Sequence, residues 1–277
     1  MDKRRMCPHC RAFITASDRI CPYCNEKVGP RAIERREPTP ILGGFIPHAR
    51  FTTVIILVIN FGMYLATTLY SMRLGNENAI WGIDARTLVE FGAKYPRAMV
   101  LGHQWWRLVT AGFLHGGLMH ILMNSWVLFD LGTQVEEVYG TSRLIVLYFV
   151  SSVFGFYISS IWSPAISVGA SAALFGLIGA MIALGVRHKS TLGAAIRGLY
   201  IRWAIYGLLF GLLPMFRVDN AAHIGGLAAG FGAAYVTGLP RIASGVTEKI
   251  WRAVAIVCLI ITVFSFIEMY LWFSQQQ

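Results

Sequence analysis

Charged residues are scarce in this chain of 277 residues. Asp, Glu, Lys and Arg together make up 14% of it, hydrophobic residues make up 56%, and the mean hydropathy is +0.56. An ordinary soluble domain carries about 25% charged residues. The composition therefore excludes a typical soluble protein and predicts an integral, multi-pass membrane protein.

Long apolar stretches supply the membrane segments. Each stretch can form most of the roughly 20-residue helix that crosses about 30 Å of hydrocarbon. Seven are predicted, at residues 51–71, 116–132, 144–162, 169–186, 199–213, 221–239 and 250–273. The fifth is the weakest, because Arg197 and Arg202 lie at its start and Pro214 ends it.

The basic residues are unevenly distributed between these segments. With the N-terminus in the cytoplasm, 18 of the 24 lysines and arginines fall on the cytoplasmic side. Because cytoplasmic loops are enriched in Lys and Arg, this orientation is favoured and the C-terminus is expected outside. The net charge of +10 is then explained by topology and contact with membrane lipids that are anionic, and no nucleic-acid partner is expected.

Cysteine is rare after residue 24. Four of the five cysteines form two CxxC pairs, Cys7 with Cys10 and Cys21 with Cys24, and the fifth, Cys258, is expected to be a small hydrophobic residue. Four thiolates at this spacing can bind a tetrahedral zinc ion, so residues 1–28 are predicted to form a structural zinc ribbon. A disulfide role is disfavoured on the reducing side of a membrane. An adaptor or regulatory role and an inert appendage both remain open.

The stretch after the cysteines is rich in proline and mixed charges. Residues 29–50 are therefore predicted to be a linker.

Two polar residues stand at the heads of apolar segments. Ser171 opens a run that has no charge until Arg187, and His223 opens another. An ionisable residue inside a membrane segment calls for a functional explanation. Small residues recur every four positions in both segments, at Ala172, Gly176 and Ala180 and at Ala222, Gly226, Gly230 and Ala234. Such stripes allow close helix packing, so we expect Ser171 and His223 to face each other within hydrogen-bonding reach.

This pair predicts nucleophilic catalysis. A serine hydroxyl is a poor nucleophile until a base takes its proton, and His223 can be that base. No carboxylate stands beside either residue in the sequence, which favours a dyad over a triad. His120 and Asn124 lie four residues apart on one predicted helical face, where they can donate hydrogen bonds to an oxyanion.

Three other functions remain possible from these residues. A catalytically inactive protein could bind transmembrane clients, and a transporter could use His115, His120 and His223 as proton relays. The absence of paired intramembrane carboxylates argues against the transporter. The third possibility places the function in the zinc ribbon, with the membrane part as an anchor.

Several motifs occur in the same order as in a known family. They are Trp106-Arg107, His115, the stretch from His120 to Asn124, Gly169-Ala170-Ser171, and Ala222-His223 followed by Gly226 and Gly230. The chain resembles the rhomboid intramembrane serine proteases on these motifs. The resemblance implies an all-α polytopic fold with a six-helix catalytic core at 51–240, and it leaves residues 241–277 as an additional transmembrane helix and tail.

The resemblance also implies roles for individual residues. Ser171 would be the nucleophile, His223 the base, and His120 and Asn124 the oxyanion donors, with no cofactor needed for catalysis. The substrates would be transmembrane proteins cut near the outer face, and the expected location is a bacterial cytoplasmic membrane. Residues 72–104 would lie sideways in the outer leaflet, and either they or the fifth segment would form the moving gate.

Two further positions follow from the resemblance. Glu136 matches an acidic residue that braces the fold. Residue 172 is alanine where the family usually has glycine, and its methyl group is expected to narrow the pocket or alter packing against the sixth segment.

Overall fold

The structure is a computed structural model, and it describes residues 4–7, 9–15, 18–28, 50–213, 218–238 and 245–276. The chain divides into two compact units, Met1–His48 and Ala49–Gln277. The predicted linker at 29–50 lies outside the described residues except for Arg50.

The first unit is a small cysteine-containing hairpin. Strands β1 (Arg4–Met6) and β2 (Phe13–Thr15) pair antiparallel, with Met6 opposite Phe13. Cys7, Ile14, Cys21 and Val28 form its small buried cluster. So few buried side chains give little stability, and a unit of this size usually needs a metal or disulfides.

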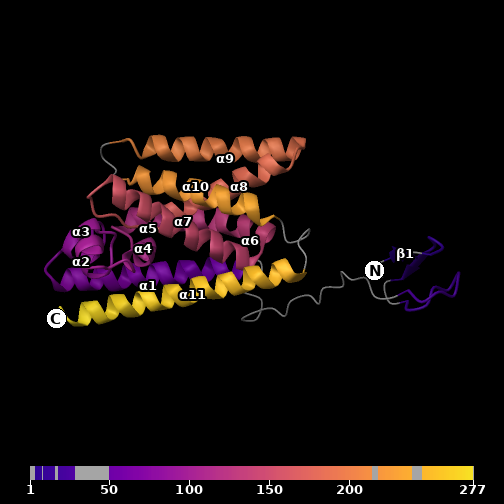
Figure 1. The fold of residues 1–277 in the computed structure, drawn as a ribbon, viewed down its shortest axis with the longest axis horizontal. Coiled ribbons are helices and arrows are strands. Elements are labelled where there is room, and N and C mark those ends of the chain that lie inside the picture. The colour runs from indigo at the N-terminus through magenta and orange to yellow at the C-terminus, as the bar shows by residue number, and fades with distance from the viewer. Residues whose placement is uncertain are drawn as a thin grey trace. The chain divides into compact units, whose positions relative to one another are not determined.

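The second unit consists of helices (Figure 1). In chain order they are α1 (Phe51–Arg73), α2 (Ala85–Glu90), α3 (Pro96–Leu101), α4 (Arg107–Thr110), the 3-10 helix η3 (Ala111–Phe113), α5 (Leu118–Val127), the π-helix η4 (Leu128–Gly132), α6 (Thr133–Tyr139), α7 (Thr141–Trp162), α8 (Ser171–Arg187), α9 (Thr191–Phe210), α10 (Asn220–Thr237) and α11 (Gly245–Ser274). Helix α8 is central, with 13 of its 17 residues buried. Helices α7, α9 and α10 pack around it, and α9 lies at the outer edge (Figure 1).

Every predicted apolar segment coincides with a helix or a run of helices, which confirms the polytopic helical fold. Three described helices, α1, α7 and α11, are long and apolar enough to cross a membrane, and α8 is a shorter apolar helix. The second predicted segment extends beyond residue 132, because the π-helical turn η4 joins α5 to α6. The fifth begins at Thr191 and not at 199, because the Ser190 hydroxyl accepts a hydrogen bond from the Gly193 N–H and caps the helix there.

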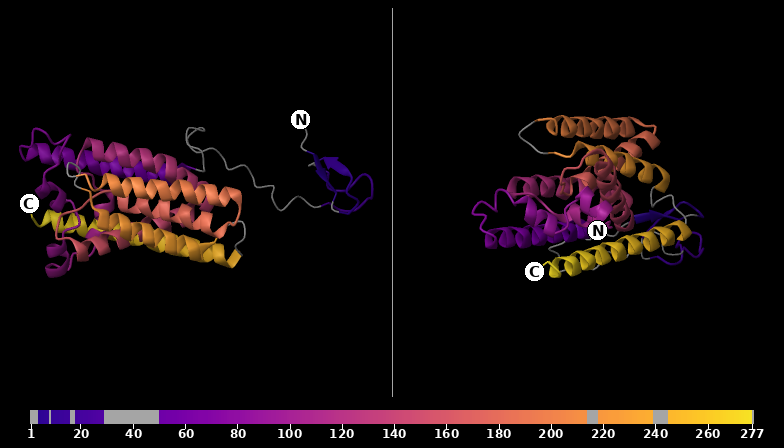
Figure 2. Two further views of the ribbon diagram at one scale, coloured as in Figure 1. Left: turned by 90° about the horizontal axis from the view of Figure 1, so that it is seen from above. Right: turned by 60° about the vertical axis from the view of Figure 1, so that its left-hand side comes forward.

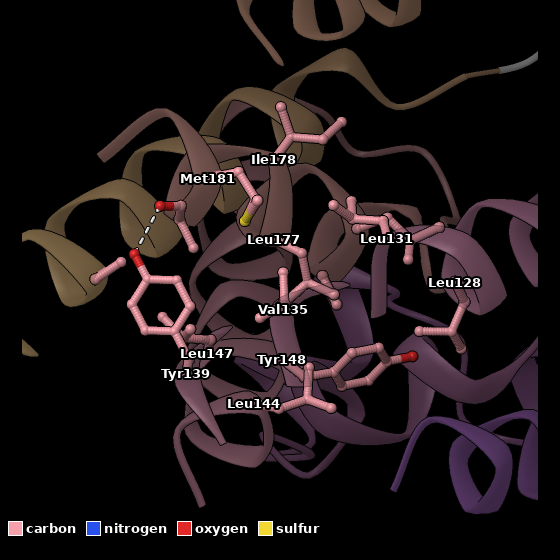
Figure 3. Close-up of a cluster of buried hydrophobic side chains, with 14 of the residues drawn as sticks. Leu128, Leu131, Val135, Tyr139, Leu144, Leu147, Tyr148, Leu177, Ile178 and Met181 are labelled. Atoms are coloured by element: carbon pink, nitrogen blue, oxygen red, sulfur yellow. Dashed lines mark hydrogen bonds between the residues drawn. The ribbon is translucent and has the colours of Figure 1, made fainter. Parts of the chain in front are cut away.

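The largest hydrophobic cluster lies where η4, α6, α7 and α8 meet. Its side chains are drawn in Figure 3, and they include Leu131, Val135, Leu147 and Leu177. The hydroxyl of Tyr139 donates to the carbonyl oxygen of Ala180 at 2.9 Å, which satisfies a buried polar group within the cluster. This cluster fixes α8, the helix that begins with Ser171.

Glu136 of α6 joins its own helix to the starts of α1 and α7. Its carboxylate accepts hydrogen bonds from the backbone N–H groups of Thr52 and Thr53, both at 3.2 Å, and from the hydroxyls of Thr53 and Thr141. The residue is only 4% exposed. A carboxylate is favourable at a helix N-terminus because it satisfies free N–H groups and complements the helix dipole. These contacts agree with the bracing role that the family resemblance implies for Glu136.

The stretch between α1 and α4 is folded and partly buried. Asp84 caps α2 by accepting from Thr87, and it also accepts from the Ser71 hydroxyl of α1. Burial alone would raise the pKa of Asp84, but these hydrogen bonds outweigh it and hold the pKa below its usual value. Arg107 is fully buried and donates to the carbonyl oxygens of Val89 and Ala93 at the end of α2.

Helix α11 runs along one side of the helical unit, and Figure 2 shows it in yellow from two further directions. Near its start, Glu248 forms a two-point ion pair with Arg143 of α7, at 2.8 and 3.0 Å. Near its end, Trp272 stacks on the Arg107 guanidinium, 4.8 Å from the ring centroid, and Phe273 meets Tyr70 of α1. The helix therefore holds α7 and the folded stretch after α1 together.

We predict that Glu136→Ala destabilises the protein by about 3 kcal/mol, because the buried N–H groups of Thr52 and Thr53 would lose their acceptor. Thermal unfolding in detergent measures the effect. Glu137→Ala is the matched control, since Glu137 is the adjacent residue and is exposed, and it should change stability by less than about 0.5 kcal/mol. Equal effects of the two substitutions would contradict the bracing role.

Candidate active site

Ser171 and His223 lie at the starts of two adjacent helices. Ser171 is the first residue of α8, and His223 is in the first turn of α10. The Nε2 atom of His223 is 2.9 Å from the Oγ atom of Ser171. This is the geometry that a base needs in order to take a proton from a hydroxyl.

The close approach of α8 and α10 depends on glycine. A Cβ atom at Gly226 would overlap the carbonyl oxygen of Ala172, and one at Gly230 would overlap the carbonyl oxygen of Gly176. The two backbones are therefore in contact along the stripes of small residues, in agreement with the packing that the sequence predicts. No larger residue fits at these two positions without separating the helices.

An aromatic contact with Phe175 fixes the imidazole of His223. Its ring stacks on Phe175, with centroids 4.1 Å apart and planes 13° apart. Phe175 in turn lies against Gly207 of α9, where an added Cβ would be 2.6 Å from the Phe175 Cζ atom. The His223 side chain is 5% exposed, and its Nδ1 atom has no hydrogen-bond partner among the described residues.

Gly169 brings His120 and Ser171 together. Its φ angle of +130° lies in a region that other residues rarely adopt. An added Cβ would be 2.7 Å from the Nε2 atom of His120 and 3.6 Å from the Ser171 Oγ atom. The position therefore requires glycine twice, once for backbone conformation and once for space.

The hydrogen bonds of His120 indicate its tautomer. Its Nδ1 atom accepts from the backbone N–H of Gly116 at 3.3 Å, so the proton of the neutral ring is on Nε2. That N–H is directed toward Gly169 and is available as a donor. The ring also meets His115 edge to face, at 5.2 Å between centroids.

Asn124 is less clearly directed at the dyad. Its side-chain Nδ2 atom donates to the carbonyl oxygen of His120 at 2.9 Å, one turn earlier in α5. This bond uses one of the two N–H groups of the amide and leaves the second free to donate. The catalytic and oxyanion roles of all four residues stay predictions.

Asp219 is a charged residue near the dyad that the sequence reasoning missed. It is the N-cap residue of α10, and its Oδ1 atom accepts from the Ala222 N–H at 3.0 Å. An Asp directly before an apolar helix is a common N-cap signal and could have identified it.

The methyl group of Ala172 points into the helix packing. It lies in a buried cluster with Ala111, Phe156 and Ala222, and it is 1% exposed. Gly155 of α7 provides the space, because a Cβ there would be 2.9 Å from the Ala172 Cβ atom. The alanine methyl group thus packs against both α7 and α10.

The four N-terminal cysteines form one cluster. Their sulfur atoms all lie within 4.8 Å of one another, with Cys7 and Cys24 3.7 Å apart and Cys10 and Cys21 3.6 Å apart. A tetrahedral zinc site with Zn–S bonds of about 2.3 Å has sulfur atoms about 3.8 Å apart. The cluster therefore has the donors and the spacing to hold a metal ion.

The thiols of this cluster also differ in acidity. The backbone N–H groups of Cys10 and His9 lower the pKa of Cys7 to about 6. The backbone N–H of Glu26 lowers the pKa of Cys24, but burial and the neighbouring thiols outweigh it and raise this pKa to about 12. Because like charges repel, four thiolates this close need a cation to ionise together.

The fold and the site define an integral membrane protein with a serine and a histidine paired at the ends of two closely packed helices. Comparison with known families agrees with this class, since residues 102–240 match the rhomboid domain. The chain belongs to the rhomboid family.

Relatives include one protein named as a protease and one named as inactive. The chain is 36% identical over 176 residues to "Rhomboid protease GluP" of Bacillus subtilis (strain 168), covering 64% of this chain and 34% of that protein. It is 32% identical over 237 residues to "RHOMBOID-like protein 5" of Arabidopsis thaliana, covering 75% of each. It is also 34% identical over 160 residues to "Inactive RHOMBOID-like protein 8" of the same plant, covering 57% of this chain and 45% of that protein.

We predict that Gly230→Ala destabilises the protein by about 1 to 3 kcal/mol, because its Cβ meets the backbone of α8. Thermal unfolding in detergent is the measurement. Gly232→Ala is the control on the same helix, since nothing lies within 4 Å of its added Cβ, and it should leave stability unchanged or slightly raised. Equal unfolding temperatures of the two variants would contradict the close backbone contact between α8 and α10.

Proposed function

We propose that this protein is an intramembrane serine endopeptidase that hydrolyses peptide bonds in or near transmembrane helices of other membrane proteins. The observation that carries the proposal is the 2.9 Å contact between the His223 Nε2 atom and the Ser171 Oγ atom. Membership of the rhomboid family and similarity to a relative named as a protease support it.

In the proposed reaction, the Ser171 Oγ atom attacks the substrate carbonyl carbon while the Nε2 atom of His223 takes its proton. The tetrahedral intermediate collapses, the peptide C–N bond breaks, and His223 returns the proton to the leaving amine. Water then attacks the acyl-enzyme while His223 takes its proton; the ester C–O bond to Ser171 breaks, and His223 returns the proton to the Ser171 Oγ atom. No carboxylate contacts Nδ1 of His223 among the described residues, which fits a dyad.

His120 and Asn124 are the proposed oxyanion donors. The Nε2–H of His120 faces the space beside Gly169 and Ser171, which is where the carbonyl oxygen of a substrate bound at Ser171 would lie. Each donor of this kind contributes roughly 2.7 to 4 kcal/mol to transition-state stabilisation. The free backbone N–H groups at the start of α8 would add to them.

The substrate is proposed to reach the dyad past α9. Only three of the 20 residues of this helix are buried, compared with 13 of 17 in α8. Substrate helices that unwind easily at Gly or Pro should be preferred, because an extended segment is needed at the dyad. The dyad is at the end of the helical unit where α1 ends, so with the N-terminus in the cytoplasm the site faces outward.

The alternative is an inactive protein that binds transmembrane clients. The similarity to a relative that is named as inactive supports this alternative. The presence of Ser171 and His223 in hydrogen-bonding contact favours the protease.

We predict that Ser171→Ala and His223→Ala abolish cleavage of a reporter transmembrane helix by purified protein in liposomes. His120→Ala should lower kcat by about 100- to 1,000-fold, because a donor to the oxyanion is lost. His188→Ala is the matched control, since His188 is exposed at the end of α8 and should have no effect. Cleavage that persists in Ser171→Ala would refute the proposal, and folded wild-type protein that cuts no reporter would favour the client-binding alternative.

The cysteine cluster is proposed to hold one structural zinc ion. Cys7, Cys10, Cys21 and Cys24 would be its four ligands, and zinc would neutralise their charge and close the small hairpin. A closed site with four protein ligands has no open position, so the metal takes no part in catalysis.

Purified protein is expected to contain about one zinc ion per chain by elemental analysis. Cys21→Ser should lose that zinc because a ligand is removed, whereas Cys258→Ser should retain it, since Cys258 lies in α11. Equal zinc contents in the wild type and in Cys21→Ser would contradict this assignment.

A further inference from the structure

Two buried polar residues and one partly buried residue lie near the helix ends that lead to the dyad, and they take no part in the proposed chemistry. They are Lys94, which precedes α3, Ser159 in the last turn of α7, and Asp219 at the start of α10. Lys94 and Ser159 are fully buried. Buried charges are costly unless other groups compensate for them, so their arrangement needs a reason.

Asp219 orders the turn that carries the base. Its Oδ1 atom accepts from the Ala222 N–H at 3.0 Å, and its backbone oxygen accepts from the His223 N–H at 3.1 Å. The side chain and the main chain of one residue thus fix the first turn of α10. Any shift of Asp219 moves the backbone of His223.

Ser159 holds the carboxylate of Asp219. The Ser159 hydroxyl donates to the Oδ2 atom of Asp219, a contact between residues 60 positions apart in the chain. The start of α10 is therefore tied to the end of α7. Without this hydroxyl, one carboxylate oxygen would lose its hydrogen bond.

Lys94 connects the end of α7, where Ser159 lies, to the segment that leads to Ser171. Its Nζ atom donates to the carbonyl oxygens of Ser159, Ser163 and Ala165, at 3.4, 3.1 and 2.8 Å, and so caps the end of α7. Its backbone pairs in both directions with Ser167, at 3.0 and 3.1 Å. Ser171 follows Ser167 in the chain by four residues.

Lys94 and Asp219 also interact through their opposite charges. Burial lowers the pKa of Lys94, and the negative charge of Asp219 opposes that shift. Ser159 stands between the two, since its carbonyl oxygen accepts from Lys94 and its hydroxyl donates to Asp219. The lysine and the aspartate therefore stabilise each other through the end of α7.

We propose that Lys94, Ser159 and Asp219 form a positioning network that sets the geometry between the Ser171 hydroxyl and the His223 imidazole. One arm runs from Lys94 through Ser167 to Ser171, and the other runs from Ser159 through Asp219 to His223. The inference rests on the proposed protease function, because it assigns the network to the geometry of that dyad.

The test compares Ser159→Ala with Ser160→Ala. Ser160 is the next residue of α7, and among the described residues its hydroxyl bonds to the Tyr157 carbonyl oxygen and not to Asp219, so it is a matched control. Two rates are measured in the full-length protein: cleavage of a reporter helix, and labelling of Ser171 by a fluorophosphonate. Ser159→Ala should lower kcat and the labelling rate by about tenfold with KM within about twofold, because misplacing catalytic groups slows the chemical step. Ser160→Ala should match the wild type.

Variants of Asp219 separate positioning from general stability. Asp219→Ala should lower kcat at least as much as Ser159→Ala, whereas Asp219→Asn should recover most of the activity, because Asn caps a helix as well as Asp. The double variant Ser159→Ala, Asp219→Ala should be no slower than Asp219→Ala, since residues acting as a unit have non-additive effects. If Asp219→Asn is as slow as Asp219→Ala, or the effects multiply, the network is overturned.

Hydrogen exchange gives a readout that does not need activity. The amides of residues 218–226 should exchange faster in Ser159→Ala and Asp219→Ala than in the wild type and in Ser160→Ala. Unchanged exchange in both variants would overturn the network. If the wild-type protein neither cleaves a reporter nor reacts with the fluorophosphonate, the proposed function fails, and the exchange rates then decide separately whether Ser159 and Asp219 order the first turn of α10.

Discussion

The structure depends on the backbone contact between α8 and α10. Lipid is as apolar as a leucine side chain, so helices in a membrane are held together by close packing and hydrogen bonds and not by exclusion of water. Gly226 and Gly230 allow the two backbones to touch. This contact makes one rigid body of the two helices that begin with Ser171 and His223, and it leaves the dyad geometry little freedom along most of their length.

The ends of these helices need a different kind of support. Packing of small residues fixes the distance between two helices, but it does not fix the first turn, where the backbone N–H groups have no partners. Polar residues from other elements supply that support here. Glu136 binds the free N–H groups of α1, and Asp219 binds one at the start of α10. The order of a site at helix ends therefore depends on the polar groups that cap those ends.

The sequence was sufficient to predict the pairing of Ser171 with His223, because a four-residue repeat of small side chains has one simple structural meaning. Glu136 was identified from a family resemblance, and its contacts agree with the expected role. The π-helical turn at Leu128–Gly132 was not predicted, since no local residue pattern marks it. The contact between Ser159 and Asp219 was also beyond reach, because it joins residues 60 positions apart whose proximity depends on the packing of α7 against α10.

In the proposed protease, the backbone contact between α8 and α10 restricts where a substrate could enter. Separating α8 from α10 would break contacts along both helices, whereas only three of the 20 residues of α9 are buried. Tyr200 donates to the Oε1 atom of Gln134 at 2.8 Å, and Leu208 accepts from the Nδ2 atom of Asn220 at 3.1 Å. The second contact lies beside the start of α10. Lipid can replace the apolar neighbours of α9 at little cost, whereas its displacement must break those hydrogen bonds and the close contacts of Gly207 with Phe175 and of Arg197 with Gly185.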